Sequence, residues 1–177
     1  MSSIFSFIDL FCGIGGFRLA MESIGGICVF SSDKSRRARE TYFANFKDIP
    51  AGNITKIDAE DIPPFDVLCG GFPCQPFSMA GHKRGFEDPR GQMFFEIARI
   101  VKHHRPKVLF LENVAHLIRH DGGRTFQVIT DTLDGSGYEV HYKVLTASDY
   151  GVAQVRKRVY LVCFRKDLQV EFSFPEP

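Results

Sequence analysis

The feature that most constrains the fold is a strand, a glycine turn and a helix at the start of the chain. Residues 4–11 form an apolar run typical of a buried strand, and Cys-Gly-Ile-Gly-Gly-Phe follows at residues 12–17. Apolar residues then recur at helical spacing until a glycine pair at residues 25 and 26, where a helix commonly ends. Because this geometry brings backbone N–H groups and a helix N-terminus against a ligand, it predicts an α/β fold that binds a small molecule at the turn.

A second apolar strand, at residues 27–31, ends close to Asp33. A carboxylate at this position accepts hydrogen bonds from ribose hydroxyls in nucleoside-binding α/β folds. Two other glycine motifs are excluded. No Gly-Lys-Ser/Thr follows the turn, so it is not a P-loop, and the third glycine of a dinucleotide-binding fingerprint is missing. The glycine turn alone therefore does not identify the ligand.

A cysteine between two prolines follows the next apolar run. Residues 66–69 are typical of a strand, and Gly-Gly-Phe-Pro-Cys-Gln-Pro-Phe-Ser follows at residues 70–78. Proline fixes φ at about −65° and removes a backbone donor, so Pro73 and Pro76 predict a stiff turn. Such a turn can hold the Cys74 thiol in one pose as a nucleophile. The alternative is that Cys74 is a small buried core residue.

Further segments extend the pattern toward the end of the chain. They are a helix that opens near residue 88 and runs to about residue 104, a strand at 106–111 followed by Glu-Asn-Val at 112–114, Gln-Val-Arg-Lys-Arg at 154–158, and an apolar strand at 159–164. With the motifs Phe-Ile-Asp-Leu-Phe-x-Gly-x-Gly-Gly-Phe, Gly-Phe-Pro-Cys-Gln-x-Phe-Ser, Glu-Asn-Val and Gln-x-Arg-x-Arg in order, the chain resembles bacterial DNA (cytosine-5) methyltransferases of restriction–modification systems. The resemblance implies an α/β, Rossmann-like, S-adenosylmethionine-dependent methyltransferase fold, with a largely parallel sheet and helices on both faces.

The resemblance also implies covalent catalysis. C5 of cytosine is a poor nucleophile, and a thiolate added at C6 turns the ring into an enamine whose C5 can attack the methyl group of S-adenosylmethionine. Cys74 would supply the thiolate, and Arg156 or Arg158 would raise the thiolate fraction. Glu112 would meet the Watson–Crick edge of the base. Its alternative role is that of a strand-end glutamate paired with a lysine.

A mobile loop at about residues 78–90 is a further implication of the resemblance. The target carbon lies inside the duplex, so the base must leave the stack and enter a pocket. Small residues and basic side chains suit a loop that closes over a phosphate backbone, while the alternative is an ordinary solvated loop. The implied DNA-contacting residues are Ser78, His82, Lys83, Arg84 and Arg90.

For the cofactor, S-adenosylmethionine, the resemblance implies a pocket beside the glycine turn. Its residues would be Phe11, Gly13, Gly15, Gly16, Asp33, Asn53, Ile54, Pro73 and Met93. Phe11 would lie against the adenine and Asp33 on the ribose. Three positions depart from the family pattern, since Asp33 replaces a glutamate, Lys34 a bulky apolar or aromatic residue, and Asn53 an aspartate. Asn53 still accepts a hydrogen bond but carries no charge, so these departures bear on cofactor affinity rather than on the pocket's location.

The family carries further parts that this sequence does not match. A target-recognition domain and a C-terminal segment that completes the cofactor pocket follow the last strand in its members. We therefore expect residues 1–177 to form a single catalytic and cofactor-binding domain that lacks the recognition domain. With 44% hydrophobic residues and no internal repeat, the chain has enough apolar material for one core.

The charge and the cysteines bear on partners and location. A net charge of +1 is small for a protein that binds duplex DNA alone, which agrees with DNA affinity residing partly in another polypeptide. We expect two partners, double-stranded DNA and a second polypeptide with the recognition domain and the C-terminal motifs. The five cysteines show no metal-ligand spacing, so no metal site is predicted. The sequence has no evident signal peptide or membrane span, and a cytoplasmic location is expected.

Three interpretations of the chain stay open. In the first, it is the catalytic subunit of a split cytosine-5 methyltransferase. In the second, it is a catalytically silent binding or regulatory module, which Lys34 and Asn53 favour but the intact Cys74, Glu112 and Arg158 oppose. In the third, it is a shortened methyltransferase without an independent role. A neighbouring gene that encodes the missing motifs would separate the first from the third.

Overall fold

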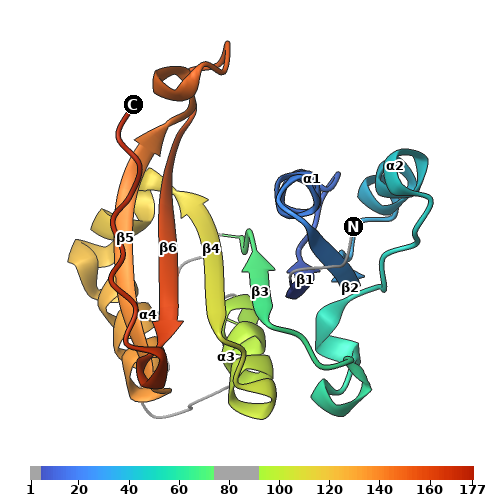
Figure 1. The fold of residues 1–177 in the computed structure, drawn as a ribbon, viewed down its shortest axis with the longest axis horizontal. Coiled ribbons are helices and arrows are strands. Elements are labelled where there is room, and N and C mark those ends of the chain that lie inside the picture. Colours follow the sequence, from blue (N-terminus) through green and yellow to red (C-terminus); the bar gives the residue numbers. More distant parts are fainter. Residues whose placement is uncertain (1–4, 74–91) are drawn as a thin grey trace.

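The computed structural model describes residues 5–73 and 92–177, whose strands form one six-stranded sheet (Figure 1). The strand order across the sheet is β2-β1-β3-β4-β6-β5. The strands are β1 Phe5–Leu10, β2 Gly26–Ser32, β3 Val67–Gly70, β4 Val108–Val114, β5 Tyr138–Thr146 and β6 Lys157–Arg165. Strands β2, β1, β3 and β4 run parallel, whereas β6 is antiparallel to both of its neighbours. The sheet is therefore largely parallel, as the sequence predicts.

The described α-helices connect these strands. They are α1 Gly16–Ser23, α2 Arg36–Phe46, α3 Gln92–His104 and α4 Arg124–Gly135. Helix α2 begins after Ser35, whose hydroxyl accepts a hydrogen bond from the Ala38 N–H at 3.3 Å and so caps a free backbone donor. Within the two described stretches, every helix is too short or too polar to cross a membrane.

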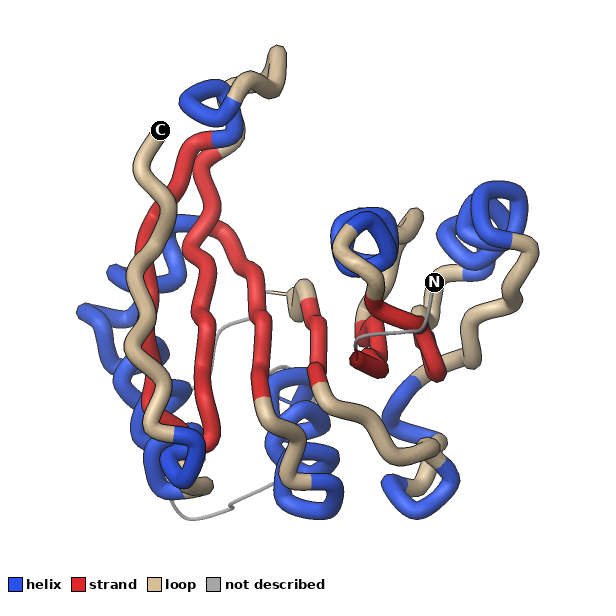
Figure 2. Tube along the Cα trace, in the orientation of Figure 1, coloured by secondary structure: helices blue, strands red, loops and turns tan. Residues whose placement is uncertain are grey.

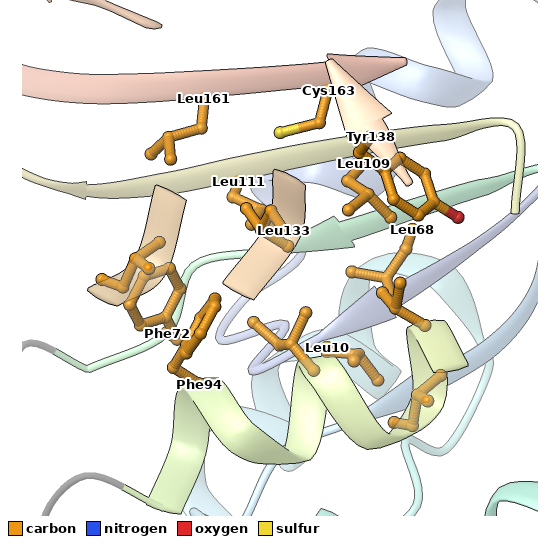
Figure 3. Close-up of a cluster of buried hydrophobic side chains, with 14 of the residues drawn as sticks. Leu10, Leu68, Phe72, Phe94, Leu109, Leu111, Leu133, Tyr138, Leu161 and Cys163 are labelled. Atoms are coloured by element: carbon orange, nitrogen blue, oxygen red, sulfur yellow. The ribbon is translucent and has the colours of Figure 1, made fainter. Parts of the chain in front are cut away.

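One face of the sheet, which we call the closed face, packs on α3 and α4. Side chains of a strand alternate between the two faces, so Leu109 and Leu111 of β4 point to the same side as Leu161 of β6. All three are fully buried. Figure 3 shows such strand side chains directed toward Phe94 of α3 and Leu133 of α4. This layer is the main hydrophobic core.

The opposite face of β3, β4, β6 and β5, which we call the open face, is covered by a described helix only at its β3 and β4 end, where α1 reaches Cys69 and Phe110. Helix α1 covers β1 on this side, where Met21 packs on Phe7 and Cys69. The Phe110 ring of β4 lies 5.1 Å from the Phe17 ring of α1, centroid to centroid, and both Phe110 and Val162 of β6 are only partly buried. They form part of the floor of an apolar cavity of about 610 Å³. In Figure 1 this side of β4 and β6 faces the viewer, and α4 lies behind the sheet.

An extended segment, residues 169–177, borders the open face along β5 (Figure 2). The Phe172 ring lies 5.3 Å from that of Phe164, centroid to centroid. The Tyr150 hydroxyl donates a hydrogen bond to the Pro175 carbonyl oxygen at 2.9 Å. These contacts fix the segment as a wall of the apolar cavity rather than as a cover over it.

The sequence predicts most of these elements. It places β1, β2, β3, β4 and β6 within a few residues of their bounds, and likewise α1 and the C-terminal end of α3. It does not predict α4 or β5. The expected start of the helix at residues 88–91 lies outside the described residues.

Candidate active site at the carboxyl ends of the strands

The glycine turn after β1 adopts conformations that ordinary side chains disfavour. Phe11 has φ 55°, Gly13 has φ 56° and Gly15 has φ 97°. A Cβ atom at Gly15 would overlap the Phe46 ring, so this position requires glycine both for its φ and for its space. A left-handed phenylalanine costs on the order of 1 kcal/mol or more, and such residues cluster at ligand sites. Phe11 is therefore held in place by its surroundings.

Asp33, at the end of β2, ties the glycine turn to the start of α2. The Gly13 N–H donates to its Oδ2 at 2.9 Å, and the Ser35 N–H donates to its Oδ1 at 2.7 Å. A carboxylate has about four acceptor positions, so these two bonds leave capacity for a ligand hydroxyl. The predicted ribose contact of Asp33 is compatible with this geometry and stays a prediction.

A cavity of about 230 Å³ lies where β1, β2 and β3 end. It is lined by Phe11, Ser32, Asp33, Lys34, Asn53, Ile54, Gly71, Pro73 and Met93. The structure thus brings together the predicted cofactor residues Phe11, Asp33, Asn53, Ile54, Pro73 and Met93. The predicted Gly13, Gly15 and Gly16 do not line the cavity and instead shape the turn beside it. Lys34 lies at the exposed side of the cavity.

Two polar side chains of this cavity differ in their hydrogen bonding. The Asn53 Oδ1 accepts from the Thr55 N–H at 3.2 Å and caps the short helix Ile54–Lys56. The Ser32 hydroxyl is buried and has no hydrogen-bond partner among the described residues. Because an unpaired buried polar group is unfavourable, Ser32 is suited to bind a polar ligand in the cavity. Sequence reasoning missed it, although its place beside Asp33 is a usable signal.

A second group of predicted residues meets where β4 ends and β6 begins. The Arg158 Nε lies 2.8 Å from the Glu112 Oε1, and the Arg156 Nη2 lies 3.5 Å from the same oxygen. Because β6 is antiparallel to β4, its first residues meet the last residues of β4. The side chains of Glu112 and Arg158 are 20% and 22% exposed, so the pair is shielded from solvent but still accessible. Among the residues that the structure describes, the ion-pair partners of Glu112 are two arginines.

The residues next to Glu112 hold the segment that leads to Cys74. The Asn113 Nδ2 donates to the Phe72 carbonyl oxygen at 2.9 Å, and Asn113 is 2% exposed. A Cβ atom at Gly71 would stand 3.4 Å from the Glu112 Oε2, so the backbone passes close to that carboxylate. The Glu-Asn pair therefore contacts the chain just before the predicted nucleophile. Sequence reasoning assigned no role to Asn113.

Several predicted site residues lie outside the described residues. These are Cys74 and the predicted DNA-contacting residues Ser78, His82, Lys83, Arg84 and Arg90. Their roles stay predictions.

The described cysteines are not suited to act as nucleophiles. Burial raises the pKa of Cys28 to about 11 and that of Cys163 to about 12. Burial also raises the pKa of Cys12 and Cys69 above the ordinary thiol value. These thiols stay protonated near neutral pH, and the thiolate is the reactive form. Within the described ranges, no three His, Cys, Asp or Glu side chains are grouped so that they could hold a metal ion.

Comparison with known proteins gives consistent matches over nearly the whole chain. Residues 5–177 match the family model described as C-5 cytosine-specific DNA methylase. The chain is 51% identical over 172 residues to the Type II methyltransferase M.HhaI of Haemophilus parahaemolyticus, covering 97% of this chain and 53% of that protein. It is 54% identical over 177 residues to M.MspI of Moraxella sp, covering 99% of this chain and 42% of that protein.

A solved structure gives the same fold. The S. pombe Dnmt2 methyltransferase superposes with a TM-score of 0.77 at 22% identity, covering 96% of this chain and 53% of that chain. The protein described by these 177 residues thus spans about half the length of the curated relatives it matches.

Proposed function

Because the chain belongs to the C-5 cytosine-specific DNA methylase family, we propose that it transfers a methyl group from S-adenosylmethionine to C5 of cytosine in double-stranded DNA. The observation that carries this proposal is the position of Glu112, which is ion-paired to Arg158 and lies beside the backbone that leads to Cys74. An acidic group and two guanidinium groups meet at one edge of the sheet, beside the Gly71 backbone that precedes the predicted nucleophile in the sequence. This combination suits addition to a pyrimidine ring.

The cavity beside the glycine turn supports a nucleoside cofactor. Its apolar side chains Phe11, Ile54 and Met93 suit a purine ring, and the unpaired Ser32 hydroxyl and the Asp33 carboxylate suit polar groups of the ribose. S-adenosylmethionine, when bound, supplies an electrophilic methyl group.

We propose that residues 74, 112, 156 and 158 divide the chemistry. The Cys74 thiolate forms a bond to C6 of the flipped cytosine, and the displaced electron pair makes C5 nucleophilic. Glu112 binds N3 and the exocyclic amine, which stabilises the ring as the thiolate adds. Arg158 and Arg156 hold the Glu112 carboxylate in place and supply positive charge to the site. Bound S-adenosylmethionine would supply the methyl group to C5 and leave as the thioether S-adenosylhomocysteine. Loss of the C5 proton to water or another base would then allow the C6–S bond to break, with its electron pair returning to the Cys74 sulfur as the thiolate.

We further propose that residues 1–177 are one catalytic and cofactor-binding domain that works with a second polypeptide. That polypeptide would supply the target-recognition domain and complete the cofactor pocket. Two observations support this arrangement. The chain spans about half the length of its relatives, and its net charge of +1 is small for a protein that binds duplex DNA alone. The competing proposal is a catalytically silent module, which Lys34 and Asn53 favour because they depart from the family pattern at the cofactor site.

Transfer of labelled methyl groups from S-adenosylmethionine to genomic DNA tests the proposal. The chain would be assayed alone and with a polypeptide that carries the unmatched part of M.HhaI, and 5-methylcytosine would be identified by mass spectrometry. Cys74→Ala should abolish transfer. Glu112→Gln should lower kcat by about 100-fold or more while DNA binding changes little. The reason is that the amide no longer stabilises the charge that develops on the cytosine ring in the transition state.

The matched control for the second variant is Glu60→Gln, which changes an exposed glutamate far along the chain from Glu112. It should leave transfer unchanged. Equal losses of kcat and of DNA affinity in Glu112→Gln would contradict the assigned role. Absence of 5-methylcytosine in both mixtures, together with no S-adenosylmethionine binding in a calorimetric titration, would favour the silent module.

A further inference from the structure

One wall of the candidate cofactor cavity is formed by a segment without regular secondary structure beyond two short helical turns. Asn53 and Ile54 line the cavity, and they begin the stretch 53–62, which we call the wall segment. Its described backbone–backbone hydrogen bonds join residues three apart, such as the bond from the Ile57 N–H to the Ile54 carbonyl oxygen at 3.2 Å. Bonds of this kind shape each turn, but they do not fix the segment's distance from the rest of the fold.

The side chain of Arg99, on α3, makes hydrogen bonds of longer range to the wall segment. Its Nη2 donates to the Ile57 carbonyl oxygen at 2.8 Å and lies 3.3 Å from the Ile54 carbonyl oxygen. Glu96, one turn earlier on α3, accepts from the Arg99 Nε at 3.1 Å and from Nη2 at 2.8 Å. The carboxylate therefore orients the guanidinium group toward the two carbonyl oxygens. Hydrogen bonds from a charged donor are stronger than neutral ones.

His104, at the end of α3, makes a similar bond farther along the wall segment. Its Nε2 lies 2.8 Å from the Ala59 carbonyl oxygen, and it is the donor because a carbonyl oxygen only accepts. The His104 ring also lies 4.9 Å from the Phe65 ring, centroid to centroid. Helix α3 thus holds the wall segment at two points. Only the point made by Arg99 includes a residue that lines the cavity, namely Ile54.

Helix α3 also supplies a lining residue of its own. Met93, near its start, lines the same cavity as Ile54. Because Met93 and Arg99 belong to one helix, the bonds of Arg99 set the spacing between the Met93 side and the Ile54 side of the cavity. Arg99 itself is not among the described residues that line the cavity, so it acts on this spacing without contacting a ligand there.

We infer that Arg99 is a positioning residue for the cofactor, because it holds Asn53 and Ile54 at the distance from Met93 that the bound ligand requires. The inference rests on the proposed binding of S-adenosylmethionine and deepens it. Site residues bind well only when neighbouring groups fix their positions. Loss of Arg99 should therefore weaken cofactor binding, whereas the methyl-transfer step at saturating cofactor should be little affected.

Calorimetric titration with S-adenosylmethionine and with S-adenosylhomocysteine tests the inference. Arg99→Met keeps the aliphatic stem but removes both carbonyl bonds, and it should weaken the two ligands by the same factor, about tenfold. Arg99→Lys keeps the charge but not the planar fork, so it should recover part of the loss. In the methyl-transfer mixtures, kcat at saturating S-adenosylmethionine should change by less than about twofold while KM rises.

His104→Phe is the matched control. It removes a bond from α3 to a carbonyl oxygen of the wall segment, and it keeps a ring against Phe65. Both ligand affinities should stay within about twofold of the original, because Ala59 does not line the cavity. A purely structural role for Arg99 predicts instead that Arg99→Met and His104→Phe weaken the ligands equally.

Hydrogen exchange measured by mass spectrometry gives a readout without a ligand. Arg99→Met should speed exchange of the amides at residues 53–57, and His104→Phe should speed exchange at residues 59–62, with the strands unchanged in both variants. Unchanged exchange at residues 53–57 in Arg99→Met would overturn the inference. Loss of affinity for S-adenosylmethionine but not for S-adenosylhomocysteine would also overturn it, since Arg99 would then act through its charge on the sulfonium group.

The same measurements separate this inference from the proposed function. Cofactor binding that depends on Arg99, without methyl transfer in either mixture, would leave the inference standing while the proposed activity fails. Cofactor binding that Arg99→Met leaves unchanged would overturn the inference alone. Absence of binding of either ligand by the original chain, alone and with the second polypeptide, would overturn the proposed cofactor and the inference together.

Discussion

The closed and open faces belong to the same strands but differ in how deeply their apolar side chains are buried. On β4 and β6, Leu109, Leu111 and Leu161 point to the closed face and are fully buried under α3 and α4. Their sequence neighbours Phe110 and Val162 point the other way and are only partly buried. Both sets are strongly apolar. The alternation of apolar residues therefore indicates which side chains need cover, but it does not indicate whether the covering segment is present.

The two faces also differ in how they treat polar groups. The buried hydroxyl of Tyr138, on the closed-face side, donates to the Pro106 carbonyl oxygen at 2.7 Å. The Asp9 side chain of β1 points to the same side of the sheet as that of Phe7, which is the side that α1 covers. Asp9 is fully buried there. Neither of its carboxylate oxygens makes a hydrogen bond of normal geometry among the described residues. The buried Tyr138 hydroxyl therefore has a hydrogen-bond partner, whereas the buried Asp9 carboxylate has none among the described residues.

The largest expected difference comes from one substitution made on each face. Leu161→Ala, on the closed face, should lower the free energy of unfolding by about 2–5 kcal/mol, because it leaves a cavity in a filled core. Leu145→Ala, on the open face, should cost less than about 1.5 kcal/mol, since the side chain is only partly buried. Urea denaturation of both variants measures the difference. Equal losses would mean that the open face is packed in solution.

The next effect is a pH dependence that originates at Asp9. Desolvation by burial raises the pKa of Asp9 to about 7, and the nearby Arg18 offsets only part of the shift. The folded state then binds a proton that the unfolded state has released, so stability is full below about pH 4 and falls as the pH rises to 7. The fall attributable to this group should be at most about 4 kcal/mol.

Asp9→Asn should remove this part of the pH dependence, which denaturation between pH 4 and 8 would measure. Asp61→Asn, at an exposed site, is the matched control and should leave the profile unchanged. A profile of Asp9→Asn that still falls by the same amount would show that the carboxylate is ionised in the folded protein. Asp9 would then be a buried carboxylate ion beneath α1 rather than a neutral carboxylic acid.

A smaller effect is expected from the closed-face hydrogen bond. Tyr138→Phe removes the donor to the Pro106 carbonyl oxygen and leaves that buried acceptor unpaired. The expected loss in unfolding free energy is about 1–3 kcal/mol. Tyr142→Phe is the control, because Tyr142 is 50% exposed, and its cost should be below about 0.5 kcal/mol. Comparable losses for both variants would argue that the hydroxyl of Tyr138 is not specifically bonded.

The smallest effect is expected when a valine is replaced by threonine on either face of β6. Val159→Thr places a hydroxyl in the fully buried closed face and should cost about 1 kcal/mol, as the hydroxyl loses its water partners. Val162→Thr should cost clearly less, and it should reduce binding of a hydrophobic dye to the open face. Thermal unfolding and dye titration provide the two readouts. Dye binding unaffected by Val162→Thr would place the exposed apolar surface elsewhere.

The sequence predicts the strands better than it predicts one of the helices. Strands β1, β3, β4 and β6 are apolar runs bounded by turn residues, which is a strong local signal. Helix α4 contains Thr125, Val128, Ile129, Thr130 and Thr132, and β-branched residues disfavour helices. Its helical state depends on packing, since Phe126, Ile129 and Leu133 are buried against the sheet. Strand β5 alternates apolar residues with Glu139, His141 and Lys143, so it lacks the continuous apolar run that marks the other strands.

The candidate site was predictable in composition but not in its internal contacts. The motifs identify Glu112 and Arg158, and antiparallel pairing of β4 with β6 brings them within 2.8 Å. The bond from Asn113 to the Phe72 carbonyl oxygen joins residues far apart in the chain, so it depends on strand register. The same holds for the bond from Gly13 to Asp33. Contacts of this kind are set by tertiary geometry, which a motif does not encode.

The reversed direction of β6 has a consequence for how this edge of the sheet can change. Strands rise about 3.3 Å per residue, so a parallel β6 would carry Arg158 to the opposite edge, roughly 25 Å from Glu112. Because β6 runs backward, the loop that enters it and the loops that leave β1, β3 and β4 all open on one side. Residues of the entering loop can therefore be replaced or lengthened without shifting the register of any strand. The reversed direction of β6 thus separates the loop that enters it, whose length can vary, from the strands, whose register must be kept.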